Sequence, residues 1–250
     1  AVIAEPARAV PYIPPPGYWQ MVRQACIEHG ALLIFDEIPT GLGKTGKMFA
    51  CEHESVTPDI LCIGKGLTGG YLPMAATVAR PHVFNAFLAR ASDSRQFFHG
   101  HTFGGNPLAA AAAMASLDLL TESSYLDRVA EKGEYLRNRI ISELSDQPHV
   151  GDIRGRCMML GIELVADRAT RRPFPSELQL GRSVCRRTVR NGVWIRPLGD
   201  VIILMPPLIA TEAELDMLAT VVTESIKAET ANLIEQNDSI SSDASITHHE

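Results

Sequence analysis

Hydrophobic and polar positions follow two different patterns in the two parts of the chain. In the first part, four short apolar runs have the length of buried strands: "AVIA" at 1–4, "ALLIF" at 31–35, "ILCI" at 60–63 and "MAATVA" at 74–79. Between the first two runs, the stretch 17–30 places Trp19, Val22 and Cys26 on one face of a helix, with Gly30 as its C-cap. Short buried strands separated by a helix or a long loop predict an α/β fold with a mostly parallel sheet.

From residue 106 onward the pattern is that of longer helices and further strands. Helices are predicted over 106–120, 124–144, 176–192 and 211–226, and strands within 151–165, "VWIRP" and "VIILMPP". The last helix opens with a capping box between Thr211 and Glu214. These elements predict a small α+β domain over 122–230, after a first domain over 1–121. The polar, Ser- and Asp-rich residues 231–250 predict a disordered tail.

The amino-acid composition limits which binding partners and which cellular compartment we expect for this chain. The chain has 250 residues, of which 46% are hydrophobic and 21% are charged, so it can bury a sizeable core. Its formal net charge of −6, without a basic cluster, argues against nucleic acid as the main partner, and no apolar stretch reaches membrane-spanning length. The five cysteines are scattered and contain no C-x-x-C pair, which favours a reducing cytoplasm over a disulfide framework or a zinc site.

A charged side chain lies at the end of each of the first three apolar runs. Glu5 and Asp36 come directly after their runs, and Lys65 follows Gly64 after the third. One such charge most often marks only the point where the chain reaches the surface. In open parallel sheets, however, ligands bind beyond the carboxyl ends of the strands, where side chains from several loops converge. We therefore expect Asp36 and Lys65 together to form a site.

The pair of Asp36 and Lys65 suits one cofactor in particular. A lysine amine attacks an aldehyde only when it is neutral, and desolvation lowers its pKa. A carboxylate at the neighbouring strand end can keep a pyridine nitrogen protonated, which is the recurring arrangement around pyridoxal phosphate. Glycines surround the lysine and would let a planar ligand approach the backbone: Gly64, Gly66, Gly69 and Gly70. The pattern predicts that Lys65 carries pyridoxal phosphate.

Two other motifs each lack a residue that their chemistry requires. "GLGKTGK" at 41–47 is similar to a nucleotide P-loop, but Ile38 stands where that motif needs its first glycine. His99 and His101 have a spacing found in metal sites, but the sequence places no third ligand, so we expect no metal. The same segment has glycines and Thr102 just ahead of a helix, which predicts a cradle for a phosphate group.

With these residues in view, the chain resembles the class III (ω-amino) aminotransferases, which are pyridoxal-phosphate enzymes of fold type I. The D-E-x-x-T-G pattern that starts at Asp36 and the G-K-x-L pattern around Lys65 are typical of the class. "KMFACEH", "PDILCIGK", "HGHTF" and "IRPLGD" resemble its biotin-synthesis branch. The resemblance covers nearly all of the chain ahead of residue 231. It implies a partial large domain that binds the cofactor, with an interdomain helix, followed by a small C-terminal domain.

The resemblance implies a role for each matching residue near the cofactor. Lys65 bonds to the cofactor and transfers a proton, Asp36 pairs with the pyridine nitrogen, and Ile38 packs under the ring. Thr102 binds the cofactor phosphate of the opposite subunit, which implies a homodimer. Glu5 matches the family's E-P pair, and its role stays open.

The resemblance also implies the substrates. Arg196 would bind the carboxylate of 8-amino-7-oxononanoate, in a pocket that Gly100 lines. The amine of S-adenosylmethionine would pass to this substrate and give 7,8-diaminononanoate, in the cytoplasmic synthesis of biotin. Three alternatives stay open: lysine as the donor, another class III ω-aminotransferase, and a non-catalytic truncated remnant.

Departures from the family pattern bear on these alternatives. The stretch 7–17 is shorter than the family's glycine-rich segment, and Ile203 stands where many members have tyrosine, so the donor is not fixed by the motifs. The chain opens without an initiator Met, and the N-terminal half of the family pattern has no counterpart in it. We therefore expect a fragment of an enzyme rather than a self-sufficient one.

Overall fold

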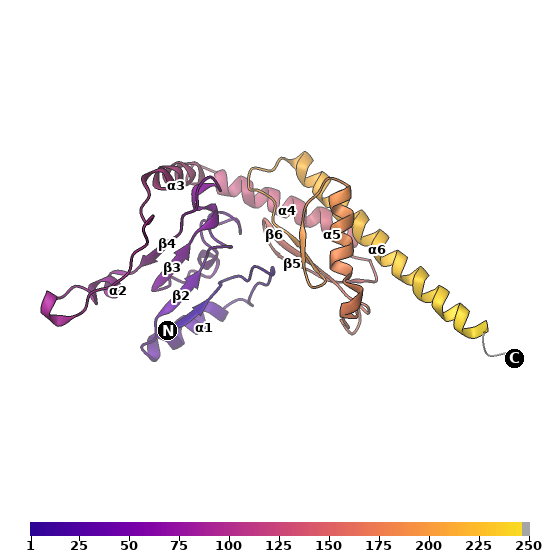
Figure 1. The fold of residues 1–250 in the computed structure, drawn as a ribbon, viewed down its shortest axis with the longest axis horizontal. Coiled ribbons are helices and arrows are strands. Elements are labelled where there is room, and N and C mark those ends of the chain that lie inside the picture. The colour runs from indigo at the N-terminus through magenta and orange to yellow at the C-terminus, as the bar shows by residue number, and fades with distance from the viewer. Residues whose placement is uncertain (247–250) are drawn as a thin grey trace. The chain divides into compact units, whose positions relative to one another are not determined.

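The computed structural model describes the backbone of residues 1–246 and the side chains of residues 1–233 (Figure 1). The chain divides into two compact units, Ala1–Glu131 and Lys132–Glu250. The division falls inside helix α4 (Tyr125–Leu144), whereas the sequence pattern placed it after residue 121. Each unit is described by itself below.

A four-stranded sheet organises the first unit. Its strands lie in the order β1 (Val2–Ala4), β2 (Leu33–Asp36), β3 (Ile60–Ile63) and β4 (Ala76–Ala79). The first three are mutually parallel, and β4 runs antiparallel to β3. All four apolar runs are therefore strands, and the predicted mostly parallel sheet is confirmed with one antiparallel edge strand. The antiparallel edge follows from the link between β3 and β4, which contains no crossover α-helix.

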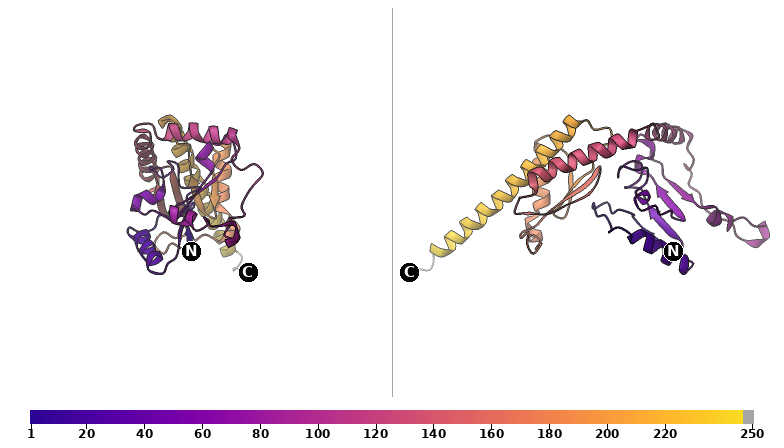
Figure 2. Two further views of the ribbon diagram at one scale, coloured as in Figure 1. Left: turned by 90° about the vertical axis from the view of Figure 1, so that its left-hand side faces the viewer. Right: turned by 180° about the vertical axis from the view of Figure 1, so that it is seen from behind.

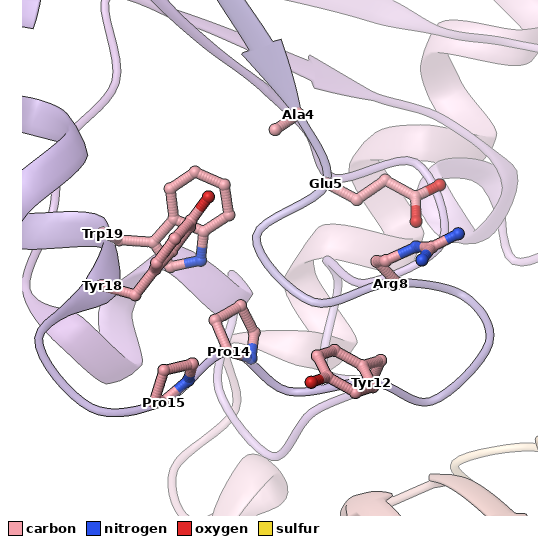
Figure 3. Close-up of a pocket in the computed structure, with 8 residues that line it drawn as sticks. All are labelled: Ala4, Glu5, Arg8, Tyr12, Pro14, Pro15, Tyr18 and Trp19. Carbon is pink, nitrogen blue, oxygen red and sulfur yellow. The ribbon is translucent and has the colours of Figure 1, made fainter.

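The loop after β1 folds back before helix α1 (Tyr18–Glu28) begins. The Glu5 carboxylate accepts a hydrogen bond from the Ala9 N–H at 2.9 Å, which closes the start of the loop. The Trp19 indole N–H donates to the Pro6 carbonyl at 2.7 Å and fastens the loop to the helix. A pocket of about 650 Å³ lies between the loop and the start of the helix (Figure 3).

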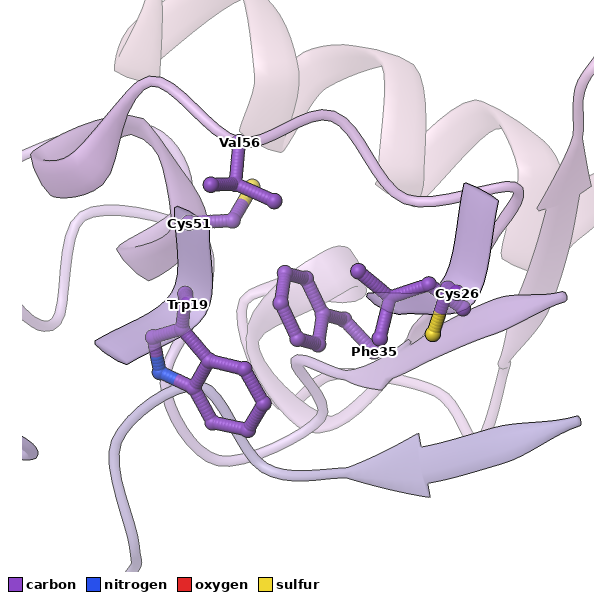
Figure 4. Packing of buried hydrophobic residues seen from close by; sticks show 6 residues of the cluster. Trp19, Cys26, Phe35, Cys51 and Val56 are labelled. Atoms are coloured by element: carbon purple, nitrogen blue, oxygen red, sulfur yellow. The ribbon is translucent and has the colours of Figure 1, made fainter. Parts of the chain in front are cut away.

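The core of the first unit lies between α1 and β2. Trp19 and Cys26, predicted to share a helical face, are both buried. The rings of Trp19 and Phe35 meet edge to face with centroids 4.8 Å apart, and Cys51 and Val56 complete the cluster (Figure 4). Such an aromatic pair adds about 1 kcal/mol to the free energy of unfolding beyond the buried area alone.

The chain between the strands and the long helices has only short helical turns. They are the 3-10 helices η1 (Ala50–Glu54), η2 (Lys65–Thr68) and η3 (Ala91–Asp93), and the helix α2 (Pro81–Asn85). Figures 1 and 2 show that the α2 segment extends away from the β1–β4 sheet. Helix α3 (Pro107–Leu120) then returns to η2, where the Ser116 hydroxyl donates to the Gly66 carbonyl at 3.3 Å.

The second unit is an antiparallel sheet with helices. Its strands lie in the order β5 (Val150–Arg156), β6 (Met159–Leu164), β8 (Val201–Leu204) and β7 (Arg196–Leu198). Helix α5 (Leu180–Arg190) follows η4 (Ser176–Leu178) and contacts β7, β8 and α6 (Glu212–Ile246). Leu160, Ile162, Ile202 and Leu204 share one sheet face by register and are fully buried.

Helix α6 begins with the predicted capping box and is longer than predicted. The Thr211 N–H donates to the Glu214 carboxylate at 2.8 Å, and the Glu214 N–H donates to the Thr211 hydroxyl at 3.3 Å. The helix continues to Ile246 (Figure 2), whereas the sequence pattern predicted a disordered tail over 231–250. Ala, Glu, Leu and Gln are the good helix formers within 228–236, and they extend a helix that is already nucleated. Residues 247–250 of the predicted tail lie outside the described residues.

Candidate active site

The structure brings Asp36 and Lys65 to the same edge of the β1–β4 sheet. Asp36, the last residue of β2, lies opposite Cys62 in the parallel register with β3. The Glu37 N–H donates to the Cys62 carbonyl at 2.9 Å, so pairing continues past the end of β2. Lys65 follows only three residues after Cys62, at the start of η2. The predicted convergence of the acid and the lysine at the carboxyl ends of two neighbouring strands agrees with this arrangement.

The Asp36 carboxylate is half-buried and held in place by its own turn. Its Oδ1 accepts a hydrogen bond from the Ile38 N–H at 3.0 Å. Among the described residues, no Lys or Arg forms an ion pair with Asp36. Its charge can therefore serve an N–H donor that lies outside this chain.

The backbone at Lys65 adopts a conformation that few non-glycine residues share. Its φ of 48° lies in the left-handed region, which costs a side-chain-bearing residue about 1 kcal/mol. Such conformations cluster at functional sites, where the surroundings hold a side chain in one direction. Lys65 is exposed and lines a pocket of about 470 Å³ together with Leu72 and Met74. Its amine is thus accessible to a ligand.

Gly64 is buried beside the half-buried Ile38, directly before Lys65 in the chain. A Cβ added at Gly64 would lie 3.6 Å from both Cγ atoms of Ile38 and 3.5 Å from the Cβ of Ala75. These are ordinary van der Waals distances, and the φ of −175° at Gly64 is extended, so the packing of this chain would tolerate a larger residue there. The half-buried side chain of Ile38 gives an apolar surface beside this glycine. A flat aromatic ring that needs an apolar face fits this surface, which makes pyridoxal phosphate a fitting cofactor for these residues.

A buried carboxylate that the sequence analysis did not single out holds the loop after β2. Glu37 is 0% exposed and accepts hydrogen bonds from the Ala50 N–H at 3.0 Å and the Cys51 N–H at 2.8 Å. The Thr40 hydroxyl also donates to it, at 2.5 Å. The D-E-x-x-T-G pattern contains both Glu37 and Thr40. Their spacing of three residues was the only signal in the sequence that could have predicted this hydrogen bond. Glu37 anchors the turn that carries Asp36.

Burial and the neighbouring Glu37 carboxylate raise the pKa of the Cys51 thiol. Desolvation is the larger cause, the negative charge of Glu37 adds to it, and together they raise the pKa of Cys51 to about 12. The thiol is therefore protonated and structural at neutral pH.

Gly100, Thr102 and Glu5 are not brought to the lysine by contacts of this chain. Gly100 and Thr102 are exposed on the irregular segment between α2 and α3. Among the described residues, neither has a recorded hydrogen bond or ring contact with Asp36 or Lys65. Glu5 lies at the same sheet edge, after β1, with one carboxylate oxygen engaged by Ala9.

Arg196 belongs to the second unit and lies in a row that crosses its sheet. Arg196 pairs with Ile203, Ile203 with Gly161, and Gly161 with Arg154, so the two arginines lie on the same sheet face at opposite ends of one row. Arg154 forms an ion pair with Glu163 at 2.5 Å. Arg196 is exposed, and among the described residues it forms no ion pair. It is the arginine of this row that remains accessible to an anion.

The fold is that of one class of enzyme. The family described as "Aminotransferase class-III" matches residues 1–226, and the chain belongs to this family. Its members depend on pyridoxal phosphate and have the fold-type I architecture.

Two curated relatives carry the same name, adenosylmethionine-8-amino-7-oxononanoate aminotransferase. The protein of Nitratidesulfovibrio vulgaris is 48% identical over 233 residues, which cover 92% of this chain and 43% of the relative. That of Methanocaldococcus jannaschii is 43% identical over 225 residues, covering 88% and 48%. The chain thus spans about half the length of the curated relatives it matches.

Solved structures give the same result. The crystal structure of the Methanocaldococcus jannaschii aminotransferase superposes with a TM-score of 0.85 at 42% identity, covering 91% of this chain and 53% of that chain. The (S)-enantioselective omega-transaminase of Thermomicrobium roseum superposes with a TM-score of 0.86 at 35% identity, covering 92% and 51%.

Within the described part of the chain, no group of three or more His, Cys, Asp and Glu side chains is placed to hold a metal ion. The described helices include none with the length and apolar character needed to cross a bilayer.

Proposed function

We propose that this chain works in a pyridoxal-phosphate aminotransferase that converts 8-amino-7-oxononanoate to 7,8-diaminononanoate in biotin biosynthesis, with S-adenosylmethionine as the amino donor. The observation that carries the proposal is that Asp36 and Lys65 follow two neighbouring strands at one sheet edge, beside the apolar side chain of Ile38. The substrate pair is supported by the names of the relatives. We also place the protein in the cytoplasm.

Each residue of the edge would contribute a separate property. Pyridoxal phosphate supplies an aldehyde that accepts amines and a ring that withdraws electrons. Lys65 Nζ would hold the aldehyde carbon between turnovers and move a proton during them. The Asp36 carboxylate would accept the ring N–H and keep that nitrogen positively charged, while the Ile38 N–H fixes its orientation. Ile38 would cover one face of the ring and exclude water from it.

The remaining predicted residues would serve the phosphate and the substrate. Arg196 would bind the substrate carboxylate, because a guanidinium without an ion-pair partner offers two parallel N–H donors to it. Gly100 would line the same substrate pocket. The Thr102 hydroxyl would donate to the cofactor phosphate of a second copy of the chain, so the active form would be a homodimer.

Exposed apolar side chains in the first unit support the homodimer. Tyr71, Phe98 and Phe103 are 86%, 94% and 83% exposed, and Leu108 on α3 is 71% exposed. Several large apolar side chains this exposed in one unit are what a surface that associates with a second copy would offer. Light scattering coupled to size exclusion should give twice the mass of one chain, and a monomer at micromolar concentration would contradict the proposed dimer.

Covalent labelling tests the cofactor site directly. The chain is incubated with pyridoxal phosphate, reduced with borohydride and digested, and the pyridoxyl-modified peptides are identified by mass spectrometry. We expect modification of Lys65 and far less of Lys47, an exposed lysine that serves as an internal control. Lys65→Ala should abolish the site-specific label, and Asp36→Asn should weaken it. A folded chain with equal labelling at both lysines would refute the proposed site and favour a non-catalytic remnant.

Amino-donor assays separate the remaining alternatives. After labelling is established, the enzyme is given 8-amino-7-oxononanoate with S-adenosylmethionine or with lysine, and diaminononanoate is quantified. Product with S-adenosylmethionine supports the proposal, and product with lysine alone corrects the donor. If neither donor gives product while other ω-amines do, the chain serves another class III reaction.

A further inference from the structure

Three arginines line one groove of the second unit, on residues that the proposed reaction does not use. Arg182, Arg186 and Arg190 recur every four residues along α5, so they share a helix face and follow one another at a rise of about 6 Å. They border a pocket of about 490 Å³ whose apolar part includes Val189 and Ile195. Three residues separate each of these arginines from the next in the sequence, and the helix brings them onto one face.

The charge of this helix has one sign. Helix α5 contains four arginines and no Asp or Glu, although the chain as a whole has a net charge of −6. The fourth, Arg187, forms an ion pair with Glu229 at 3.3 Å. Among the described residues, none of the three groove arginines has a carboxylate partner. The recorded side-chain partners are neutral: Gln179 for Arg182 at 3.5 Å, and Ser183 for Arg186 at 2.9 Å.

Such an arrangement costs stability unless an anion joins it. Two like charges four residues apart destabilise a helix, and α5 has two such pairs on this face. A helix face that only needed solvation would gain from mixed charges. Val189 lies between Arg186 and Arg190 along α5 and is 52% exposed. The groove therefore has both positively charged and apolar side chains in its lining.

We propose that this groove binds an organic di- or triphosphate, with a nucleoside triphosphate as the best fit. Arginine forks match phosphate oxygens and form charge-assisted hydrogen bonds with them. Three guanidinium groups spread over about 12 Å of helix suit a ligand with several adjacent negative charges. Val189 and Ile195 would contact the less polar part of the ligand. The pocket volume lies within the range of small-molecule sites, and the negative charge of the whole chain disfavours a long polyanion.

Calorimetric titration at low salt tests this site in the full chain. We expect ATP and inorganic tripolyphosphate to bind, adenosine not to bind, and the affinity to fall as salt is added. Arg186→Glu should lower the affinity for ATP at least about tenfold, because it removes one charge-assisted contact and adds a repulsive charge. The matched control is Arg168→Glu, an exposed arginine outside the groove, which should bind ATP like the unchanged chain. Arg186→Lys should retain part of the affinity.

The outcomes separate this site from the proposed active site. Lys65→Ala should leave ATP binding unchanged, whereas loss of binding in that variant would place the phosphates at the cofactor site and overturn the inference. Equal affinities of the Arg186→Glu and Arg168→Glu variants, with unchanged circular dichroism, would overturn it as well. So would adenosine binding as tightly as ATP, or no binding by the unchanged chain at millimolar ATP.

Discussion

Ile38 packs beside Gly64, and a Cβ on Gly64 would lie 3.6 Å from both of its Cγ atoms. The packing of the chain does not require a glycine at this position, so we attribute the glycine to the cofactor site. The backbone at Gly64 is extended and open to any residue. A substitution at Gly64 can therefore probe the space beside Ile38 without unfolding the protein.

Gly64→Ala should separate cofactor binding from stability. We expect the free energy of unfolding to stay within about 0.5 kcal/mol of the unchanged chain, because the new methyl group makes only ordinary contacts. Borohydride-trapped pyridoxyl label on Lys65 should fall severalfold, because the methyl group occupies the ring surface. As a contrast, Gly41→Ala would place a Cβ 2.9 Å from the Glu37 carbonyl oxygen and should cost about 1–3 kcal/mol in urea unfolding. Undiminished labelling in a folded Gly64→Ala chain would show that the ring does not lie there.

Glu37→Gln should destabilise the first unit. The substitution replaces one of two acceptor oxygens with an NH₂ group facing the backbone donors of Ala50 and Cys51. A buried donor without a partner costs about 1–3 kcal/mol, and we expect a loss of about that size in urea unfolding. Glu134→Gln, at an exposed position of α4, is the control and should change little. Equal stability of the two variants would show that the carboxylate does not anchor the loop.

Asp59 should make stability depend on pH. Burial by itself would raise the pKa of Asp59, but hydrogen bonds from Arg23, at 2.6 and 3.2 Å, and from the Leu33 N–H outweigh it and hold the pKa below its ordinary value. The stabilisation is therefore present above about pH 4, the range of an unfolded Asp, and is lost as the pH falls through the lower folded value.

Asp59→Asn measures this contribution. We expect a loss of about 3 kcal/mol at pH 7, because Arg23 keeps its charge without a partner. The difference from the unchanged chain should shrink as urea unfolding is repeated at progressively lower pH below 4. Asp118→Asn, exposed on α3, should show no such trend. A difference that is constant with pH would contradict the assigned role of the charge.

Two cysteines should resist alkylation while the chain is folded. Burial and the Glu37 charge raise the pKa of Cys51 to about 12, and burial raises that of Cys185 to about 11. At pH 8 almost no thiolate is present, and the thiolate is the reactive form. Iodoacetamide treatment followed by peptide mapping should leave both unmodified until urea is added. Rapid alkylation of Cys51 in the native chain would contradict the described burial.

The strand runs and the site edge were predictable because burial and chemistry leave local signals. The runs before Asp36 and Lys65 are short, apolar and bounded by charges, so both the strands and their shared edge follow from the sequence. The antiparallel direction of β4 was not predictable from its residues, because it depends on the path of the link after Lys65.

Features that arise only in three dimensions escaped the sequence analysis. Glu37 looks like any charged loop residue until its hydrogen bonds to Ala50 and Cys51 are seen. The row that joins Arg154 to Arg196 depends on the register of four strands, which no local pattern specifies. The polar composition after residue 230 predicted disorder, whereas α6 continues to Ile246, and the Ser- and Asp-rich residues after 236 give no local signal for that helix.

The pairing of Arg196 with Ile203 has a consequence for molecular recognition. Ile203 gives this position hydrocarbon and no hydroxyl beside Arg196. A substrate with methylene groups next to its carboxylate would place them against Ile203. A substrate with a hydroxyl or a second charge there would lose hydration without gaining a hydrogen bond. We therefore expect substrate selection to depend more on the polarity of the atoms next to the substrate carboxylate than on the strength of its ion pair with Arg196.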